Sequence, residues 1–288
     1  MNYALDALWW RLADPRVRDL AAVLTAPAPW RSGCEIPVRT LLGAHGFRYL
    51  LALDDNPAPL AAHLADETPH GGRLGRYAES LLAFWLEHAP HSRLIARNVL
   101  VADGADTLGE MDFTAEIDGR LYHIELACKY YGAADGSPER LAGLNPCDRL
   151  RDKAAKLQKQ LARAQDGAGR QALAAAGAAG VPQSGSVLRG ILFAAQGTVW
   201  QPPLNPTGWH GLYFDEWPSE TPFSDGLRYA CLPRLSYLAP ARLPEAQTRE
   251  WAQIRMQEHG LFAALERRPD GFWHETGRMM KRGVQAAA

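Results

Sequence analysis

Acidic side chains recur at alternate positions of the segment GEMDFTAEIDGRLYHIELACKYY, which covers residues 109–131. Its polar positions hold Glu110, Asp112, Glu116, His123, Glu125 and Lys129. Carboxylate oxygens are the ligands that hard cations such as Mg²⁺ prefer in proteins. The pattern therefore supports two interpretations, a site for a divalent cation or the solvated face of a β-hairpin.

Two strands must position these residues, and the Asp-Gly pair at 118–119 is a typical two-residue hairpin turn between them. With that pair as the loop, Ile117 faces Arg120, and the same register sets Asp112 opposite Glu125. Alternation along the strands gives an apolar face with Met111, Phe113, Ala115, Ile117, Tyr122, Ile124, Leu126 and Cys128. The other face holds Glu110, Asp112, Thr114, His123, Glu125, Ala127 and Lys129.

The opposition of Asp112 and Glu125 is energetically unfavourable by itself. Directly opposed β-carbons lie about 4.5–5.5 Å apart, and like charges at that position destabilise a sheet. A bound divalent cation would offset the repulsion, and Lys129 on the same face would reduce it. This reasoning supports a metal site, while the pattern alone leaves the solvated face equally open.

The segments on either side of the hairpin predict the elements that surround it. GGRLGRYAESLLAFWLEHAPH, residues 71–91, predicts an amphipathic helix with Glu79 at the edge of its apolar stripe. RLIARNVLVAD, residues 93–103, predicts a strand. After the hairpin, Asn145 is the predicted N-cap of a helix with Pro146 as its first residue. That helix carries a basic face made of Arg149, Lys153, Lys156, Lys159 and Arg163.

The remaining sequence completes a prediction of an α/β or α+β fold, a mixed sheet flanked by helices. The pattern of residues 1–69 predicts short helices separated by proline-rich turns. Residues 165–186 are rich in Ala, Gly and Ser, which predicts a mobile connection. Residues 186–196 and 227–232 predict strands, and residues 245–268 a final helix. No internal repeat is present.

Composition excludes several classes of protein. The formal net charge of −1 provides no global field for nucleic acid, so phosphate binding would need a local basic patch. The four cysteines form no C-x-x-C pair, which disfavours a zinc module and a disulfide framework. No signal peptide or membrane span is predicted, and we expect a cytoplasmic protein.

The order of the acidic residues resembles a known superfamily. A helix glutamate (Glu79), a strand aspartate (Asp112), and Glu125 with Lys129 on the next strand are similar to the core of the PD-(D/E)XK phosphodiesterases. More narrowly, GEMDF…HIELACKYY followed by NPCDRLRDKAAKLQKQL resembles the bacterial family catalogued as domain of unknown function 1853. The resemblance implies one domain over residues 1–288. It would comprise a helical N-terminal extension (1–69), a restriction-endonuclease-like core (70–240) and a helical C-terminal extension (241–288).

The resemblance also implies an activity, metal-assisted hydrolysis of phosphodiesters in DNA or RNA. The implied ligands of Mg²⁺ or Mn²⁺ are Asp112, Glu125 and Glu79. Lys129 would stabilise charge on the phosphorane or help to deprotonate the attacking water. Glu110 and His123 are auxiliary candidates on the same face.

One departure from the superfamily pattern keeps a second interpretation open. The usual acid-x-lysine motif would place lysine at 127, where this chain has Ala127, and Lys129 lies about 6.6–6.8 Å further along the strand. The alternatives are an active nuclease whose lysine has migrated, or a catalytically degenerate module that binds nucleic acid or protein. A carboxylate-pair glycosidase is less favoured, because Asp112 and Glu125 would be close together and Lys129 would share their face.

Other candidate residues support weaker hypotheses. The basic face of the helix after residue 148 could follow a nucleic-acid backbone, although such faces are usually solvated. Three tryptophans, at positions 200, 209 and 217, could stack on bases, but a role in packing is favoured. His88 and His91 have too few partners for a zinc site.

Overall fold

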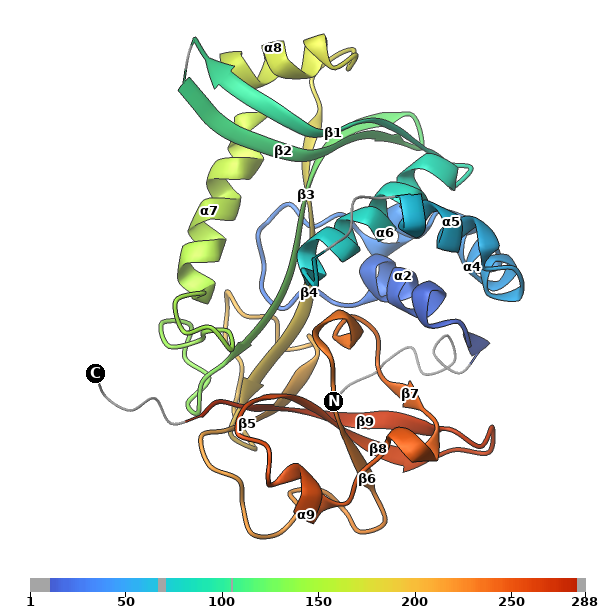
Figure 1. The fold of residues 1–288 in the computed structure, drawn as a ribbon. Coiled ribbons are helices and arrows are strands. Elements are labelled where there is room, and N and C mark those ends of the chain that lie inside the picture. Colours follow the sequence, from blue (N-terminus) through green and yellow to red (C-terminus); the bar gives the residue numbers. More distant parts are fainter. Residues whose placement is uncertain (1–10, 67–70, 105, 284–288) are drawn as a thin grey trace.

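A mixed β-sheet forms the centre of the computed structural model, which describes residues 11–66, 71–104 and 106–283 (Figure 1). Within these residues the sheet has nine strands in the order β1-β2-β3-β4-β5-β9-β8-β6, with β7 paired to β9. Its first strands are β1 (Ser92–Asp103), β2 (Asp106–Ile117), β3 (Arg120–Gly132), β4 (Gln183–Ala194), β5 (His210–Phe214) and β6 (Arg228–Cys231). Helices lie on both sides of it, as the sequence predicted.

The hairpin of β2 and β3 has the predicted turn and register. Asp118 and Gly119 both adopt positive φ, at 48° and 71°, as the tight turn requires. Antiparallel pairing runs from Ile117 opposite Arg120 to Phe113 opposite Ile124, and no pair beyond it is formed. From Tyr122 onward β3 also pairs in parallel with β4. The predicted opposition of Asp112 and Glu125 therefore falls one residue beyond the last pair, where β2 separates from β3.

Both faces of this hairpin are covered by helices. On one face α6 (Leu74–His88) packs its apolar stripe against Phe113, Ala115 and Ile124. On the other, α7 (Leu150–Arg163) packs Leu157 and Leu161 over β3 and β4. Three polar residues of the α7 side are at most 1% exposed: Thr114, His123 and Glu125. The interpretation of this face as solvated is wrong for these three residues, because α7 covers them, whereas Glu110 at the end of the face is exposed.

The N-terminal segment is helical where the structure describes it. It comprises α2 (Pro15–Thr25), α3 (Val38–Leu42), α4 (Gly46–Asp55) and α5 (Ala58–Asp66). Asp14 caps α2 by accepting hydrogen bonds from the backbone amides of Arg16 and Val17. α2 lies beside α6 on the same side of the sheet (Figure 1). Residues 1–10 and 67–70 of the predicted extension lie outside the described residues.

Two predictions around α7 are wrong. The helix begins at Leu150 rather than at Pro146, because Asn145 forms a turn of its own. Its Oδ1 accepts from the amide of Cys147 at 3.0 Å, and its carbonyl accepts from that of Asp148 at 3.0 Å. The Ala/Gly/Ser-rich connection contains a helix, α8 (Gly167–Ala175), capped by Asp166 and packed against β1.

The predicted helical C-terminal extension, residues 241–288, is also wrong for the residues described. It contains β7 (Arg242–Leu243), a short 3-10 turn (Glu245–Gln247), α9 (Trp251–Ile254), β8 (Gly260–Arg267) and β9 (Trp273–Lys281). Short apolar runs such as that of β8 do not distinguish strand from helix by periodicity. Here β8 is buried between β6 and β9, a non-local pairing that decides the outcome. No described helix has the length and apolar character needed to cross a membrane.

Candidate active site

Asp112 lies at the point where β2 leaves β3. Its Oδ2 accepts a hydrogen bond from the backbone amide of Leu126 at 2.8 Å. Burial and then the nearby Glu125 carboxylate raise the pKa of Asp112 to about 7, against the lowering effect of the Leu126 amide. The predicted repulsion between the two acids is thus present, although the two residues are not a cross-strand pair.

Glu125 is directed into the interface between β3 and α7 and is 1% exposed. Its Oε1 lies 2.9 Å from Nε2 of His123, and its Oε2 accepts from Nε2 of Gln160 at 2.6 Å. Both carboxylate oxygens are therefore engaged. Three buried polar atoms beside it have no hydrogen-bond partner among the described residues: Thr114 Oγ1, His123 Nδ1 and Gln160 Oε1.

Glu79 reaches the site from α6. It lines a cleft of about 360 Å³ together with Lys129 and Lys153. Burial raises the pKa of its carboxyl, Arg97 lowers it and Glu110 raises it. Glu79 in turn raises the pKa of Asp112, so the helix glutamate and the strand aspartate act on each other electrostatically.

Lys129 lies on the wall of the same cleft, but its ammonium group is paired. Its Nζ donates to both carboxylate oxygens of Asp148, at 2.9 and 2.8 Å. The hydroxyl of Tyr131 donates to the same carboxylate at 3.0 Å. Asp148, in the turn before α7, thus holds Lys129 in place.

Lys153 is a candidate that the sequence pattern did not single out. It extends from the first turns of α7 into the cleft and is partly buried. Burial lowers its pKa, Lys129 lowers it further, and Asp112 and Glu125 both raise it. The spacing of Lys153 indicates where it points. It lies three residues after Leu150 and four before Leu157, so it shares the helix face that packs on the sheet.

The auxiliary candidates are placed differently. Glu110 is exposed and influences the site through its charge near Glu79. His123 is fully buried, so in this structure it contacts Glu125 and does not face a substrate. Two other histidines bind backbone carbonyls, His88 that of Phe84 and His91 that of Leu41.

The three tryptophans at 200, 209 and 217 have the packing roles that the sequence favoured. Trp200 stacks on His210 with ring centroids 4.7 Å apart. Trp209 is buried in the main core. Trp217 packs edge-on against Trp251 and Phe262.

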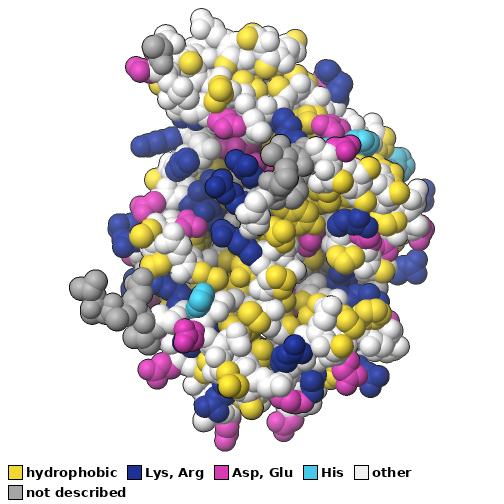
Figure 2. Space-filling view, in the orientation of Figure 1, with side chains coloured by type: hydrophobic (Ala, Val, Ile, Leu, Met, Phe, Trp, Pro, Cys, Tyr) yellow, Lys and Arg dark blue, Asp and Glu magenta, His cyan; other side chains and the backbone are white. Residues whose placement is uncertain are grey.

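Basic side chains gather on the surface that opens from the cleft. Figure 2 shows Lys and Arg side chains in the hollow between α7 and α6, with acidic side chains at its upper end. Lys129, Lys153 and Arg234 line the cleft itself. This is the local basic patch that a chain of net charge −1 needs if it is to hold a phosphate.

A cation at this site would need water and substrate as ligands in addition to carboxylates. The described residues contain no group of three or more His, Cys, Asp or Glu side chains arranged to enclose a metal. Mg²⁺, however, is usually bound through one or two carboxylates, several waters and substrate phosphate. Asp112 provides one such carboxylate. Glu125 and Glu79 lie close enough to raise its pKa.

Comparison with known proteins identifies one family. A family model described as a domain of unknown function (DUF1853) matches residues 7–281, nearly the whole chain. No curated protein and no solved structure matches it.

Proposed function

The chain belongs to the family described as a domain of unknown function (DUF1853), and we propose that it is a Mg²⁺-dependent phosphodiesterase of the PD-(D/E)XK type acting on nucleic acid. One observation carries the proposal. Asp112 and Glu125 are buried and repel one another at the point where β2 leaves β3. They lie next to a cleft that Glu79, Lys129 and Lys153 line. Buried carboxyls with raised pKa values beside cations, as Asp112 and Glu79 are, are typical of functional sites.

Each residue has a role in this proposal. Asp112, with Glu125 and Glu79, would hold the cation, which would supply a polarised phosphate and an activated water. Lys153 would stabilise the negative charge that develops on the phosphate, since it lies within the field of both Asp112 and Glu125. Lys129 would orient the substrate from the opposite wall, held in place by Asp148.

A catalytically degenerate binding module is the second candidate, and specific contacts favour it. Glu125 already uses both oxygens for His123 and Gln160, and Lys129 is paired with Asp148. For catalysis, Glu125 would have to exchange one of these hydrogen bonds for the cation. A binding module would need only the basic surface of the cleft.

Metal binding is the first test. Titration of Mg²⁺ and Mn²⁺ into the wild type should raise Tm, because a ligand that binds the folded state stabilises it. Asp112→Ala and the double variant Asp112→Ala/Glu125→Ala should lose this response. Glu139→Ala, at an exposed acidic position outside the cleft, should keep it. Equal responses in all four proteins would exclude Asp112 and Glu125 as the metal site.

Cleavage assays then separate the two candidates. Wild type and Asp112→Asn would be incubated with single- and double-stranded DNA and RNA in Mg²⁺ or Mn²⁺, and binding would be measured in parallel by fluorescence anisotropy. Metal-dependent cleavage by the wild type alone supports the nuclease. Binding without cleavage by both proteins supports the degenerate module.

A further inference from the structure

A second and larger cavity, of about 630 Å³, lies between α2 and the C-terminal strands. It has no lining residue in common with the cleft of Glu79 and Lys153. Its size is within the range of small-molecule sites. Three arginines and one aspartate are among the described residues that line it: Arg18, Arg242, Arg249 and Asp19.

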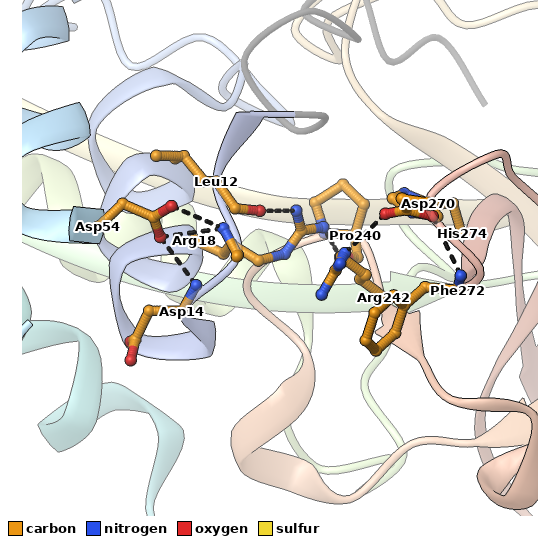
Figure 3. A network of polar contacts seen from close by, with 10 residues as sticks. Leu12, Asp14, Arg18, Asp54, Pro240, Arg242, Asp270, Phe272 and His274 are labelled. Carbon is orange, nitrogen blue, oxygen red and sulfur yellow. Dashed lines mark hydrogen bonds and ion pairs between the residues drawn. The ribbon is translucent and has the colours of Figure 1, made fainter.

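Arg18 brings a buried positive charge to this cavity. Its guanidinium donates to the carbonyl of Leu12 at 2.9 Å and to that of Pro240 at 2.8 Å (Figure 3). Burial and then Arg242 lower its pKa to about 10, against the raising effect of Asp19, Asp54 and Glu275. Arg18 and Arg242 extend toward one another in Figure 3, so two like charges meet at the cavity wall.

Arg242 is held in place by groups that leave part of it available. Its Nε donates to Asp270 at 3.1 Å, and its guanidinium lies 3.5 Å from the ring centroid of Phe272. Its two Nη groups make no hydrogen bond to a described residue, and a guanidinium can use such a pair to hold a carboxylate or phosphate. Arg249 is exposed and bonds to backbone carbonyls through one Nη group.

Asp19, the acid among the lining residues, compensates the charge of Arg18 in part, since it raises the pKa of that guanidinium. Asp19 accepts from the hydroxyl of Tyr77 and from the backbone amide of Ala239, so both of its oxygens are engaged. Burial raises its pKa to about 7. The remaining wall is largely apolar and includes Leu232, Pro233, Pro240, Leu243, Pro244 and Phe272.

We propose that this cavity binds a small organic anion. Its carboxylate or phosphate would lie on Arg242 and Arg249, beside the buried charge of Arg18. The apolar part of the ligand would lie against the leucine and proline wall. An anion in this position would relieve the repulsion between Arg18 and Arg242, as a cation would for the acids of the other site. The proposal is independent of nuclease activity.

The probe is 8-anilinonaphthalene-1-sulfonate, an aromatic anion whose fluorescence rises in apolar sites. The wild type should bind it saturably, with one tight site per chain. Arg242→Gln should weaken that site about tenfold, the effect typical of losing a charged hydrogen bond, and Arg249→Gln should weaken it less. Arg170→Gln is the matched control, because Arg170 is exposed on α8 and makes no described side-chain contact.

A neutral probe and a blocking variant complete the experiment. N-phenyl-1-naphthylamine has a similar body without the sulfonate, so it should bind the wild type at least about tenfold more weakly. Ala246→Trp places a large side chain at an exposed lining position and should abolish binding without altering an arginine. If Arg242→Gln fails to fold, as near-ultraviolet circular dichroism would show, Arg249→Gln and Ala246→Trp decide the result.

Competition identifies the anionic group. Displacement of the probe by phenyl phosphate alone assigns a phosphate ligand, and displacement by benzoate as well assigns a general anion site. Unchanged affinity in Arg249→Gln and Ala246→Trp overturns the proposal. Equal binding of the neutral and anionic probes overturns it too, since the cavity would then be merely apolar.

Discussion

Asp112 accepts a hydrogen bond from the backbone amide of Leu126 across 2.8 Å, at the residue where β2 separates from β3. The contact fixes the aspartate by the main chain of the neighbouring strand, so its position does not depend on the side chain of Glu125. The separation also opens the space in which a strand acid, a helix acid and a helix lysine influence one another. The site is therefore a consequence of how the hairpin ends.

The raised pKa of Asp112 predicts a pH-dependent effect of Asp112→Asn. The folded-state pKa of about 7 exceeds the usual 3.8, so ionisation costs the wild type stability as pH rises from about 4 to about 7. The amide variant avoids that cost and still accepts from Leu126. We expect its free energy of unfolding to exceed that of the wild type by about 4 kcal/mol above pH 7, and by nearly nothing at pH 4.

Urea unfolding at several pH values without divalent ions measures this difference. Glu139→Gln, an exposed acid, is the control and should follow the wild type. Added Mg²⁺ should reduce the gap above pH 7, because it stabilises the wild type alone. Parallel stability curves for wild type and Asp112→Asn would contradict the account.

Lys153 rather than Lys129 should control the titration of Asp112. The ammonium of Lys153 lowers the pKa of Asp112, whereas that of Lys129 is paired with Asp148. Lys153→Met should raise the midpoint of Asp112 by about one unit, while Lys129→Met and the exposed Lys159→Met should leave it unchanged. Carboxyl-carbon NMR of aspartate-labelled protein measures the midpoint. A larger shift in Lys129→Met would reverse the two roles.

Local signals predicted the centre of the fold. The Asp-Gly turn and the alternation beside it gave the hairpin, its register as far as Phe113 and Ile124, and the grouping of its polar residues. Turn chemistry and a period of two are properties of adjacent residues, which a single sequence contains.

Long-range packing explains what the sequence did not predict. The way α7 lies across β3 decides two features of the site. It brings Lys153 into the cleft, and it buries His123. The strand character of residues 260–267 depends on partners elsewhere in the sheet. Asn145 had good N-cap chemistry, but its turn competes with a helix at that position.

The buried contact between His123 and Glu125 should be far more costly to break than a surface pair between β1 and β2. The two side chains are 0% and 1% exposed, so His123→Ala leaves a buried acid with Gln160 alone. We expect a loss of about 3–5 kcal/mol in the free energy of unfolding. Arg93→Ala breaks a pair of 68% and 37% exposed side chains, to Glu116, and should cost at most about 1 kcal/mol.

A double variant separates this pairing from simple loss of packing. In His123→Ala/Glu125→Leu the acid is absent, so the second change should recover much of the stability lost in His123→Ala. Urea unfolding at pH 7 gives the four free energies of the cycle. Strict additivity would show that the histidine contributes volume alone.

Gly190 should be indispensable for the strand that carries Lys129. The two residues are paired between β3 and β4, and Gly190 has a φ of +137°, which only glycine adopts readily. A β-carbon there would lie 1.6 Å from the carbonyl oxygen of Lys129. Gly190→Ala should therefore lower the free energy of unfolding by about 3 kcal/mol or more, because either β3 or β4 must move.

Gly197→Ala isolates the effect of backbone strain. The φ of Gly197, +84°, is also positive, but a β-carbon there would meet open space. This variant should cost about 1–2 kcal/mol. Urea unfolding compares the two, and equal losses would show that the close approach to Lys129 is relieved without cost.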